Sequence, residues 1–302
     1  MDFTAFQLKI QEFLPGISLK FSEPMEKHTS FRIGGPAQVM ALPKNAEELS
    51  KILKASKLLD LNVRILGAGT NILAPDAGIS GMVICLKDCL DGMELLPDNR
   101  VRIAAGVTMA RGAMFAAGKS LSGLEFAHGI PGTVGGGVYM NAGAYGGEIC
   151  QVCESVDVMD MDGNIQRIPG SEMGFSYRHS RLEDEGGIVL SAVFALAPKP
   201  EKEIREKMQE LMAKRRASQP LDKPSAGSAF KRPVGGYAAA LIDGAGLKGY
   251  RVGDAAISEK HAGFAVNLGN ATASDVQELL RQVSDKVFEN SGIRIEPEVR
   301  IW

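Results

Sequence analysis

Several residues and segments that define whole protein classes are scarce or missing in this chain. Of 302 residues only four are cysteine and one is tryptophan, and the formal net charge is −2. A near-neutral chain offers no basic field to a polynucleotide. No stretch approaches the ~18 uninterrupted apolar residues of a membrane span, and the first residues lack the pattern of a signal peptide. We therefore expect a cytoplasmic protein with no nucleic-acid or membrane partner.

The cysteines form two close pairs, Cys85 with Cys89 and Cys150 with Cys153, a spacing that resembles half-sites for zinc. Cys85 lies in the apolar run 82–86, where a small buried hydrophobe is the expected role. The four histidines show no ligand spacing. We therefore predict structural thiols in a reducing compartment and no metal site.

Glycine is abundant and is concentrated in two places. Residues 129–147 contain a glycine at almost every second position, and Gly67-Ala68-Gly69-Thr70-Asn71 follows the strand-like run 61–66. Because glycine costs conformational entropy, such clusters indicate that bare N–H groups approach a ligand or that the backbone repeatedly adopts positive φ. Oriented amides in such turns bind anions, so both sites predict a phosphate-bearing cofactor.

A Rossmann dinucleotide fold does not fit the glycine site at residues 67–71. Its fingerprint requires a third glycine where this chain has Ile72, and the following helix would pass through Pro75 and Gly78. We therefore predict a different diphosphate-binding turn, in which the short side chains of Thr70 and Asn71 add hydrogen bonds.

The hydrophobic pattern predicts a mixed α+β chain of two or three domains. Short strands alternate with glycine turns between residues 83 and 196, and one helix is expected at 109–117. Capping-box patterns begin helices at Asn45 and at Ser274. The charge-rich helix 201–216 places Arg215 on its apolar stripe, where an arginine either meets an anion or packs its stem with its head in water.

Three further segments combine polar groups that suit a site. Residues 225–233 place hydroxyls and cations among small residues, 175–180 combine aromatic and polar groups, and Glu298 and Arg300 share one face of the closing strand. Each also has a simpler interpretation: a flexible turn, a surface cation–π pair and a charged surface strand, respectively.

Taken together, these motifs resemble the UDP-N-acetylenolpyruvoylglucosamine reductase (UDP-N-acetylmuramate dehydrogenase) family of bacterial peptidoglycan precursor synthesis. The resemblance covers nearly the whole chain through residues 28–35, 67–73, 129–147, 177–180, 215–220, 227–233, 245–250, 258–264 and 296–301. One branch of the family closes a tyrosine-bearing loop over its substrate. No tyrosine lies between Arg178 and Ser228, so the chain resembles the branch without that lid.

The resemblance implies an α+β chain with a vanillyl-alcohol-oxidase/PCMH-type FAD-binding fold in two subdomains and a C-terminal α+β substrate-binding domain. The implied limits are 1–28 for an N-terminal helical segment, 29–198 for the FAD-binding domain and 199–302 for the substrate domain. It further implies bound FAD, NADPH as co-substrate and a monomer. The implied FAD contacts are Gly67, Ala68, Gly69, Thr70, Asn71, Gly132, Thr133, Val134, Gly135, Gly136, Ala142 and Arg300.

The family's reaction is the reduction of a UDP-sugar enolpyruvyl ether. By the resemblance, Arg178 and Glu298 hold and polarise the substrate carboxylate, and Ser228 delivers the proton that completes the lactyl ether. An ionised glutamate would repel that carboxylate, so we expect Glu298 to bind protonated or to orient a donor. The resemblance also implies that Tyr177, Arg215 and Lys231 bind the substrate without taking part in the chemistry.

Two other functions remain open at this point. A flavin oxidase of the same broad fold would pass electrons to oxygen and would not need the set Arg178, Ser228 and Glu298. A non-catalytic nucleotide-binding protein would keep the glycine turns and lose the chemistry. The presence of all three residues favours the reductase.

Overall fold

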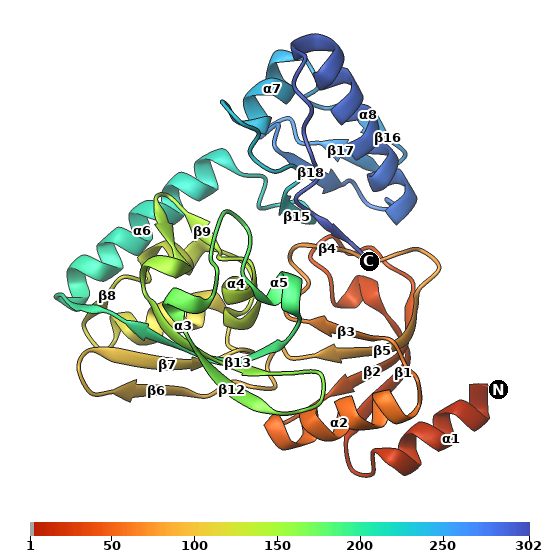
Figure 1. Cartoon of the computed structure of the whole chain (residues 1–302). Helices are drawn as coiled ribbons and strands as arrows, with labels where there is room; N and C mark the ends of the chain where they lie inside the picture. Colours follow the sequence, from red (N-terminus) through yellow and green to blue (C-terminus); the bar gives the residue numbers. More distant parts are fainter. Residues whose placement is uncertain (1–2) are drawn as a thin grey trace. The chain divides into compact units, whose positions relative to one another are not determined.

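The computed structural model describes residues 3–302, which form two compact units built from separate stretches of sequence (Figure 1). Unit 1 comprises the chain up to Phe21, Val39–Ala68 and Ser80–Ala213. Unit 2 comprises Ser22–Gln38, Gly69–Ile79 and Lys214–Trp302. The three consecutive domains expected from the sequence stay a prediction, but the chain enters each compact unit more than once.

The first sheet has the strand order β1 (Ser18–Pro24), β2 (Pro36–Leu42), β5 (Ile79–Cys85) and β3 (Val63–Leu66). Helix α2 (Ala46–Leu58) packs on it, and helix α1 (Phe3–Phe13) adds the buried Ile10 to the same core. The predicted cap forms at Asn45, whose side chain accepts from the Glu48 N–H at 2.9 Å. The Glu48 carboxylate accepts from the Lys44 N–H instead of completing the predicted box.

The second sheet of unit 1 is antiparallel, in the order β12 (Ile165–Pro169), β11 (Cys153–Met159), β13 (Ile188–Ala195), β7 (Arg100–Ala104) and β6 (Met93–Leu96). Its central strand β13 is buried along nearly its whole length, and all of its residues except Ser191 are apolar. Helices α3 (Met109–Ala117) and α4 (Val134–Tyr139) contribute to the same core. The predicted bounds of α3 are confirmed.

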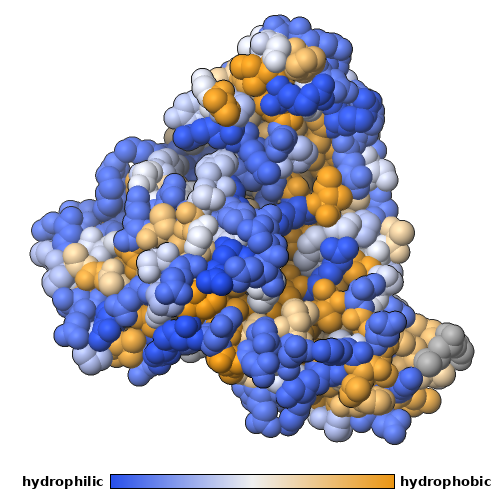
Figure 2. All heavy atoms as spheres, in the orientation of Figure 1, coloured by the Kyte–Doolittle hydropathy of each residue, from blue (hydrophilic) through white to orange (hydrophobic). Residues whose placement is uncertain are grey.

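The long helix α6 spans Glu201–Ser218. The short elements are η1 (Met25–Lys27), β4 (Ile72–Leu73), β8 (Leu121–Ser122), η2 (Glu125–Gly129), β9 (Gly143–Ala144), β10 (Gly147–Glu148), η3 (Ile149–Gln151), η4 (Gly170–Glu172), α5 (Leu182–Glu185), β14 (Ala197–Pro198) and β19 (Arg300–Ile301). Among the described residues, no helix combines the length and apolarity needed to cross a bilayer. The face drawn in Figure 2 is mostly hydrophilic, with apolar residues scattered over it.

Unit 2 contains an antiparallel sheet in the order β15 (Ser225–Ser228), β18 (Phe264–Asn267), β17 (Ala255–Ile257) and β16 (Arg251–Val252). Helices α7 (Ala238–Gly244) and α8 (Ala273–Ser291) share its core. Helix α8 begins at a capping box between Thr272 and Asp275, so the predicted cap at Ser274 is wrong. The amide and hydroxyl of Ser274 instead donate to Asp76.

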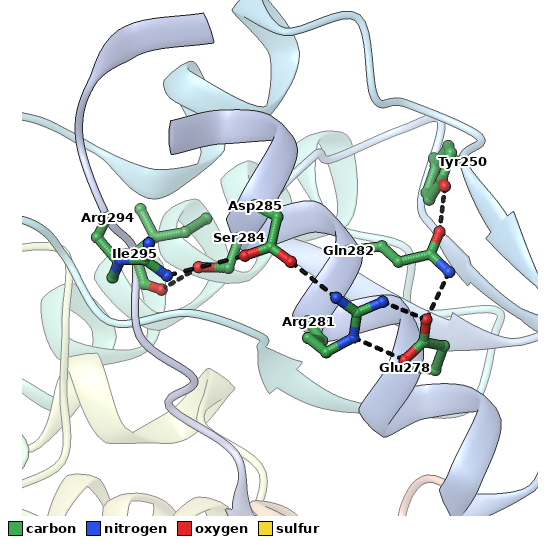
Figure 3. A network of polar contacts seen from close by, with 8 residues as sticks. All are labelled: Tyr250, Glu278, Arg281, Gln282, Ser284, Asp285, Arg294 and Ile295. Atoms are coloured by element: carbon green, nitrogen blue, oxygen red, sulfur yellow. Dashed lines mark hydrogen bonds and ion pairs between the residues drawn. The ribbon is translucent and has the colours of Figure 1, made fainter. Parts of the chain in front are cut away.

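The outer face of α8 carries a continuous network of polar contacts (Figure 3). Arg281 donates to Glu278 at 2.6 and 2.8 Å and to Asp285 at 2.8 Å. Hydrogen bonds from Arg281 lower the pKa of Glu278 to about 2. The Ser284 hydroxyl donates to the carbonyl of Ile295 at 2.8 Å, so the helix also holds the segment that leads to Glu298.

Asp76 caps the start of α8 from a distant stretch of the chain. Its carboxylate accepts from the Ala273 amide at 2.7 Å and from the amide and hydroxyl of Ser274 at 3.0 and 2.9 Å. Burial raises the pKa of Asp76, but these hydrogen bonds outweigh burial and hold the pKa below its ordinary value. A carboxylate with a depressed pKa stabilises the folded state above its unfolded pKa, and this stabilisation is lost as the pH falls through the folded pKa.

We predict that Asp76→Asn lowers the free energy of unfolding by about 1 kcal/mol near neutral pH, because an NH2 group would replace one of the two acceptor oxygens that face Ala273 and Ser274. The difference should shrink as the pH falls below ~4, where the wild-type carboxylate becomes protonated. Urea denaturation between these pH values measures both effects. Glu289→Gln on the same helix is the control, and a loss of equal size at both pH values would contradict the assignment.

Candidate active site

The start of the first glycine turn, Gly67 and Ala68, belongs to unit 1 together with the second turn, and Gly67 packs on Thr133 there. A Cβ added to Gly67 would lie 2.6 Å from Oγ1 of Thr133, so only glycine fits there without movement. Thr133 is buried and caps α4, where its hydroxyl accepts from the Gly136 amide at 3.4 Å. Turns far apart in the sequence therefore meet at one point, as a shared anion site requires.

The amides of these turns divide into two groups. Val134 and Gly135 donate to the carbonyls of Val107 and Ala105 at 2.8 and 2.9 Å, so their N–H groups serve the fold. Among the described residues of unit 1, the amides of Gly67, Ala68, Gly132 and Thr133 donate to no protein acceptor. These four N–H groups fit an anion that accepts hydrogen bonds.

Gly136 is a glycine that the protein's own packing does not require. A Cβ there would meet only Thr133 Oγ1, at 3.6 Å, whereas at Gly135 it would lie 2.8 Å from the Ala105 Cβ and at Gly137 2.7 Å from the Met109 sulfur. Glycine inside a helix costs about 1 kcal/mol relative to alanine. Close approach of a ligand explains why this position lacks a side chain.

Ala142 lies just beyond α4 and fastens the glycine segment to itself. Its amide donates to the Gly137 carbonyl at 2.7 Å, and its own carbonyl accepts from Ile149 at 3.1 Å. Its main-chain groups are thus used within unit 1, so its methyl group is what remains to contact a cofactor.

Arg178 lies at the tip of a tight turn in unit 1. Main-chain hydrogen bonds of 3.1 and 3.2 Å join Ser176 and His179, leaving Tyr177 and Arg178 between them. Arg178 has φ +57°, a left-handed conformation that costs a residue with a Cβ about 1–2 kcal/mol. Its guanidinium lies 5.3 Å from the centre of the exposed Tyr177 ring. The expected cation–π pair therefore forms, on a strained backbone.

Ser228 and Glu298 are brought together within unit 2 by main-chain hydrogen bonds. The Glu298 amide donates to the Ala229 carbonyl at 2.9 Å, and the Lys231 amide donates to the Glu296 carbonyl at 2.8 Å. Ser228 ends β15 directly before this pairing. The structure therefore places the predicted proton donor beside the segment that carries the predicted glutamate.

The predicted cofactor residues of unit 2 join the same cluster. Asn71 donates its side-chain amide to the Glu298 carbonyl at 3.2 Å, and its own carbonyl accepts from the Arg300 amide at 3.0 Å. Arg300 begins β19, which pairs in parallel with β4 directly after Thr70 and Asn71. Gly69 has φ +62° and packs on His28.

Ser30 binds two of these segments at once. Its hydroxyl lies 2.6 Å from the Ser225 carbonyl at the start of β15 and 3.4 Å from the Gly69 carbonyl, and the Ser30 amide also donates to Gly69. The turn 69–71 and the strand that bears Ser228 are thereby fixed to each other.

Among the predicted substrate-binding residues, Arg215 is buried with 8% exposure, as the helical spacing predicts for an inward position. It belongs to unit 2, at the end of α6. Lys231 is half-exposed and its ammonium lies 3.5 Å from the Glu296 carboxylate. Arg178 and Tyr177 belong to unit 1, whereas Ser228, Glu298, Arg215 and Lys231 belong to unit 2.

The cysteines occupy unlike surroundings. Cys85 and Cys153 are buried, Cys89 is half-buried and Cys150 is exposed. Burial raises the pKa of Cys89 to about 11 and that of Cys153 to about 12. Cys85 is the last residue of β5 and is buried, as the apolar residues around it in the sequence predict.

Comparison with known proteins gives one consistent result. Residues 219–302 match the C-terminal domain of UDP-N-acetylenolpyruvoylglucosamine reductase, and residues 37–169 match an FAD-binding domain. The enzyme of that name from Agathobacter rectalis is 48% identical over 98% of both chains, and one from Streptococcus pneumoniae (strain Hungary19A-6) is 43% identical over 97% of both. The crystal structure of the Thermus caldophilus enzyme matches with a TM-score of 0.78 and 37% identity, covering 95% of this chain and 98% of the other.

The chain belongs to the UDP-N-acetylenolpyruvoylglucosamine reductase family. It is an FAD-dependent oxidoreductase, and the predicted α+β fold with a PCMH-type FAD-binding domain is confirmed. The residues of unit 1 fit the cofactor: four amides donate to no protein acceptor, and Gly136 leaves room for close approach. We expect Val134 and Gly135 to contact FAD only through atoms other than their amide hydrogens.

The sequence does not identify the residues that hold the candidate site residues in place, which are Ser30, Asn141 and Ser180. Ser30 was part of a recognised motif, but nothing in the sequence indicated which carbonyls its hydroxyl would meet. Asn141 and Ser180 are buried polar residues that anchor the Arg178 turn. A polar residue inside a glycine-rich segment was the only signal for Asn141.

We predict that Gly136→Ala stabilises the apoprotein by about 0.5–1 kcal/mol, because alanine is the better helix former, and weakens its affinity for FAD. Thermal unfolding of the apoprotein and a fluorescence titration with FAD measure the two effects separately. Gly118→Ala is the control, since its Cβ would make only ordinary contacts of 3.5 Å or more. Unchanged FAD affinity in Gly136→Ala would show that the cofactor does not approach this position.

Proposed function

We propose that this chain reduces UDP-N-acetylglucosamine enolpyruvate to UDP-N-acetylmuramate with NADPH, using Arg178, Ser228 and Glu298 as catalytic residues in peptidoglycan precursor synthesis. The observation that carries the proposal is the main-chain pairing that sets Ser228 beside Glu298, next to the cofactor residue Asn71. An oxidase would have no need for a proton donor and a carboxylate-polarising group at this place.

The reaction adds a hydride and a proton across the carbon–carbon double bond of the enolpyruvyl ether. The glycine turns at Gly67 and Gly132–Gly136 would hold FAD, which would supply this hydride for the methylene carbon, with the nicotinamide as the source of the two electrons. The electron pair of the double bond then resides on the adjacent carbon and its carboxylate. The protein must stabilise that charge and protonate that carbon.

Ser228 supplies the proton. A serine hydroxyl is a weak acid, but the carbanionic carbon is far more basic, so transfer is downhill when the hydroxyl is within hydrogen-bond reach. The position of Ser228 at the end of β15, directly before the bond between Ala229 and Glu298, supports this role because the strand holds the hydroxyl on rigid backbone.

Arg178 stabilises the charge on the substrate carboxylate. Its guanidinium keeps its charge at any working pH and meets a carboxylate with two parallel hydrogen bonds. A preorganised donor of this kind typically contributes ~3 kcal/mol to lowering the barrier. The left-handed backbone at Arg178 supports a functional position, because nothing in folding favours arginine there.

Glu298 polarises the same carboxylate as a protonated donor or by orienting one. Tyr177, Arg215 and Lys231 contact the UDP-sugar. Lys231 would have to exchange its contact with Glu296 for the substrate. The preference for NADPH, the cytoplasmic location and the monomeric state rest on the family resemblance.

We predict that Ser228→Ala leaves the reduction of bound FAD by NADPH nearly unchanged and slows its reoxidation by the enolpyruvyl substrate on the order of a hundredfold or more. Anaerobic stopped-flow absorbance separates the two half-reactions. Ser291→Ala is the control, because that exposed hydroxyl bonds to the Val287 carbonyl and the Ile293 amide at the end of α8, away from the candidate residues. Equal losses in both half-reactions would refute the proton-donor role.

A further inference from the structure

The turn that carries Arg178 is fastened at both ends to one short segment, residues 139–141, directly behind α4. The Asn141 side-chain amide donates to the Ser176 carbonyl at 3.1 Å, immediately before the turn. The Ser180 hydroxyl donates to the Tyr139 carbonyl at 2.8 Å, immediately after it. Asn141 and Ser180 have exposures of 2% and 0%, so neither bond competes with water.

The orientation of the Asn141 amide is fixed by its neighbours. The Cys150 N–H can only donate, and it lies 2.9 Å from Oδ1 of Asn141, so the oxygen must face it. The NH2 group then faces the Ser176 carbonyl and, at 3.2 Å, Oε2 of Glu148. Three partners thus require an amide at this position, and neither aspartate nor leucine would satisfy them.

The backbone at both residues is held in an unfavourable conformation. Asn141 has φ +43° and Arg178 has φ +57°. Asparagine tolerates this region better than most residues, whereas arginine adopts it only when its surroundings enforce it. The hydrogen bonds of Asn141 and Ser180 hold the Arg178 turn in this conformation.

We propose that Asn141 is a positioning residue for the reaction, which acts by holding Arg178 in place through the Ser176 carbonyl. The inference rests on the proposed role of Arg178. It links that arginine to the end of α4, whose start carries the cofactor residues Thr133 and Gly136. Loss of the anchor should misplace the guanidinium, and a displacement of about 1 Å costs on the order of a hundredfold in rate.

A double-mutant cycle on the FAD-loaded protein tests the inference. The rate of flavin reoxidation by UDP-N-acetylglucosamine enolpyruvate is measured anaerobically for Asn141→Ala, Arg178→Ala and the double variant. We expect each single variant to lose about tenfold to hundredfold and the double variant to lose no more than Arg178→Ala alone. FAD affinity and reduction by NADPH should stay within about threefold of the wild type.

A second variant covers the case in which Asn141→Ala does not fold. Ser180→Ala removes the other anchor and should show the same lack of additivity with Arg178→Ala. Asn164→Ala, in the exposed turn beside Asp160, is the matched control and should keep the wild-type rate.

The outcomes separate the two claims. Losses that multiply in the double variant, or an Asn141→Ala rate equal to wild type, would overturn the positioning role and leave the proposed role of Arg178 intact. If Arg178→Ala itself leaves reoxidation unchanged, the proposed role of Arg178 fails and the positioning role fails with it.

Discussion

The candidate site residues of unit 2 depend on one main-chain hydrogen bond, from the Glu298 amide to the Ala229 carbonyl. It joins the closing segment of the chain to the residue after Ser228, and so sets the backbone of Ser228 beside the segment that carries Glu298. Asn71 extends the arrangement, because its side chain binds the Glu298 carbonyl while its own carbonyl binds Arg300.

The glycines of unit 1 serve two physical purposes that a sequence cannot separate. At Gly67, Gly135 and Gly137 a side chain would collide with other parts of the protein, so the glycine permits close packing between segments. At Gly136 no such collision occurs, and this is the position where we propose that the cofactor approaches the backbone. Packing brings Gly67 against Thr133, and the amides left without protein acceptors are the proposed anion site. Packing also supports the Arg178 turn, because buried hydrogen bonds made by Asn141 and Ser180 hold its strained backbone.

Much of the fold was predictable because its cues are local. The helix at 109–117 and the buried strand β13 follow from apolar periodicity, and the glycine turns follow from composition. The start of α8 was predicted at the wrong residue because Ser274 and Thr272 both suit a helix cap. Asp76, which is distant in sequence, accepts the hydrogen bond of the Ser274 hydroxyl, so Ser274 does not act as the cap. The pairing of Ser228 with Glu298 and the anchoring of Arg178 by Asn141 depend on contacts between remote segments. Residue types alone could name these groups as candidates but could not place them.

The most direct test of the account is an anaerobic visible spectrum of the purified holoprotein, titrated first with NADPH and then with UDP-N-acetylglucosamine enolpyruvate. The account predicts that the flavin bands bleach with the first reagent and return with the second. Flavin that bleaches and returns only on admission of air would contradict it in favour of an oxidase. A protein that shows no flavin bands after reconstitution with FAD would contradict the cofactor site itself.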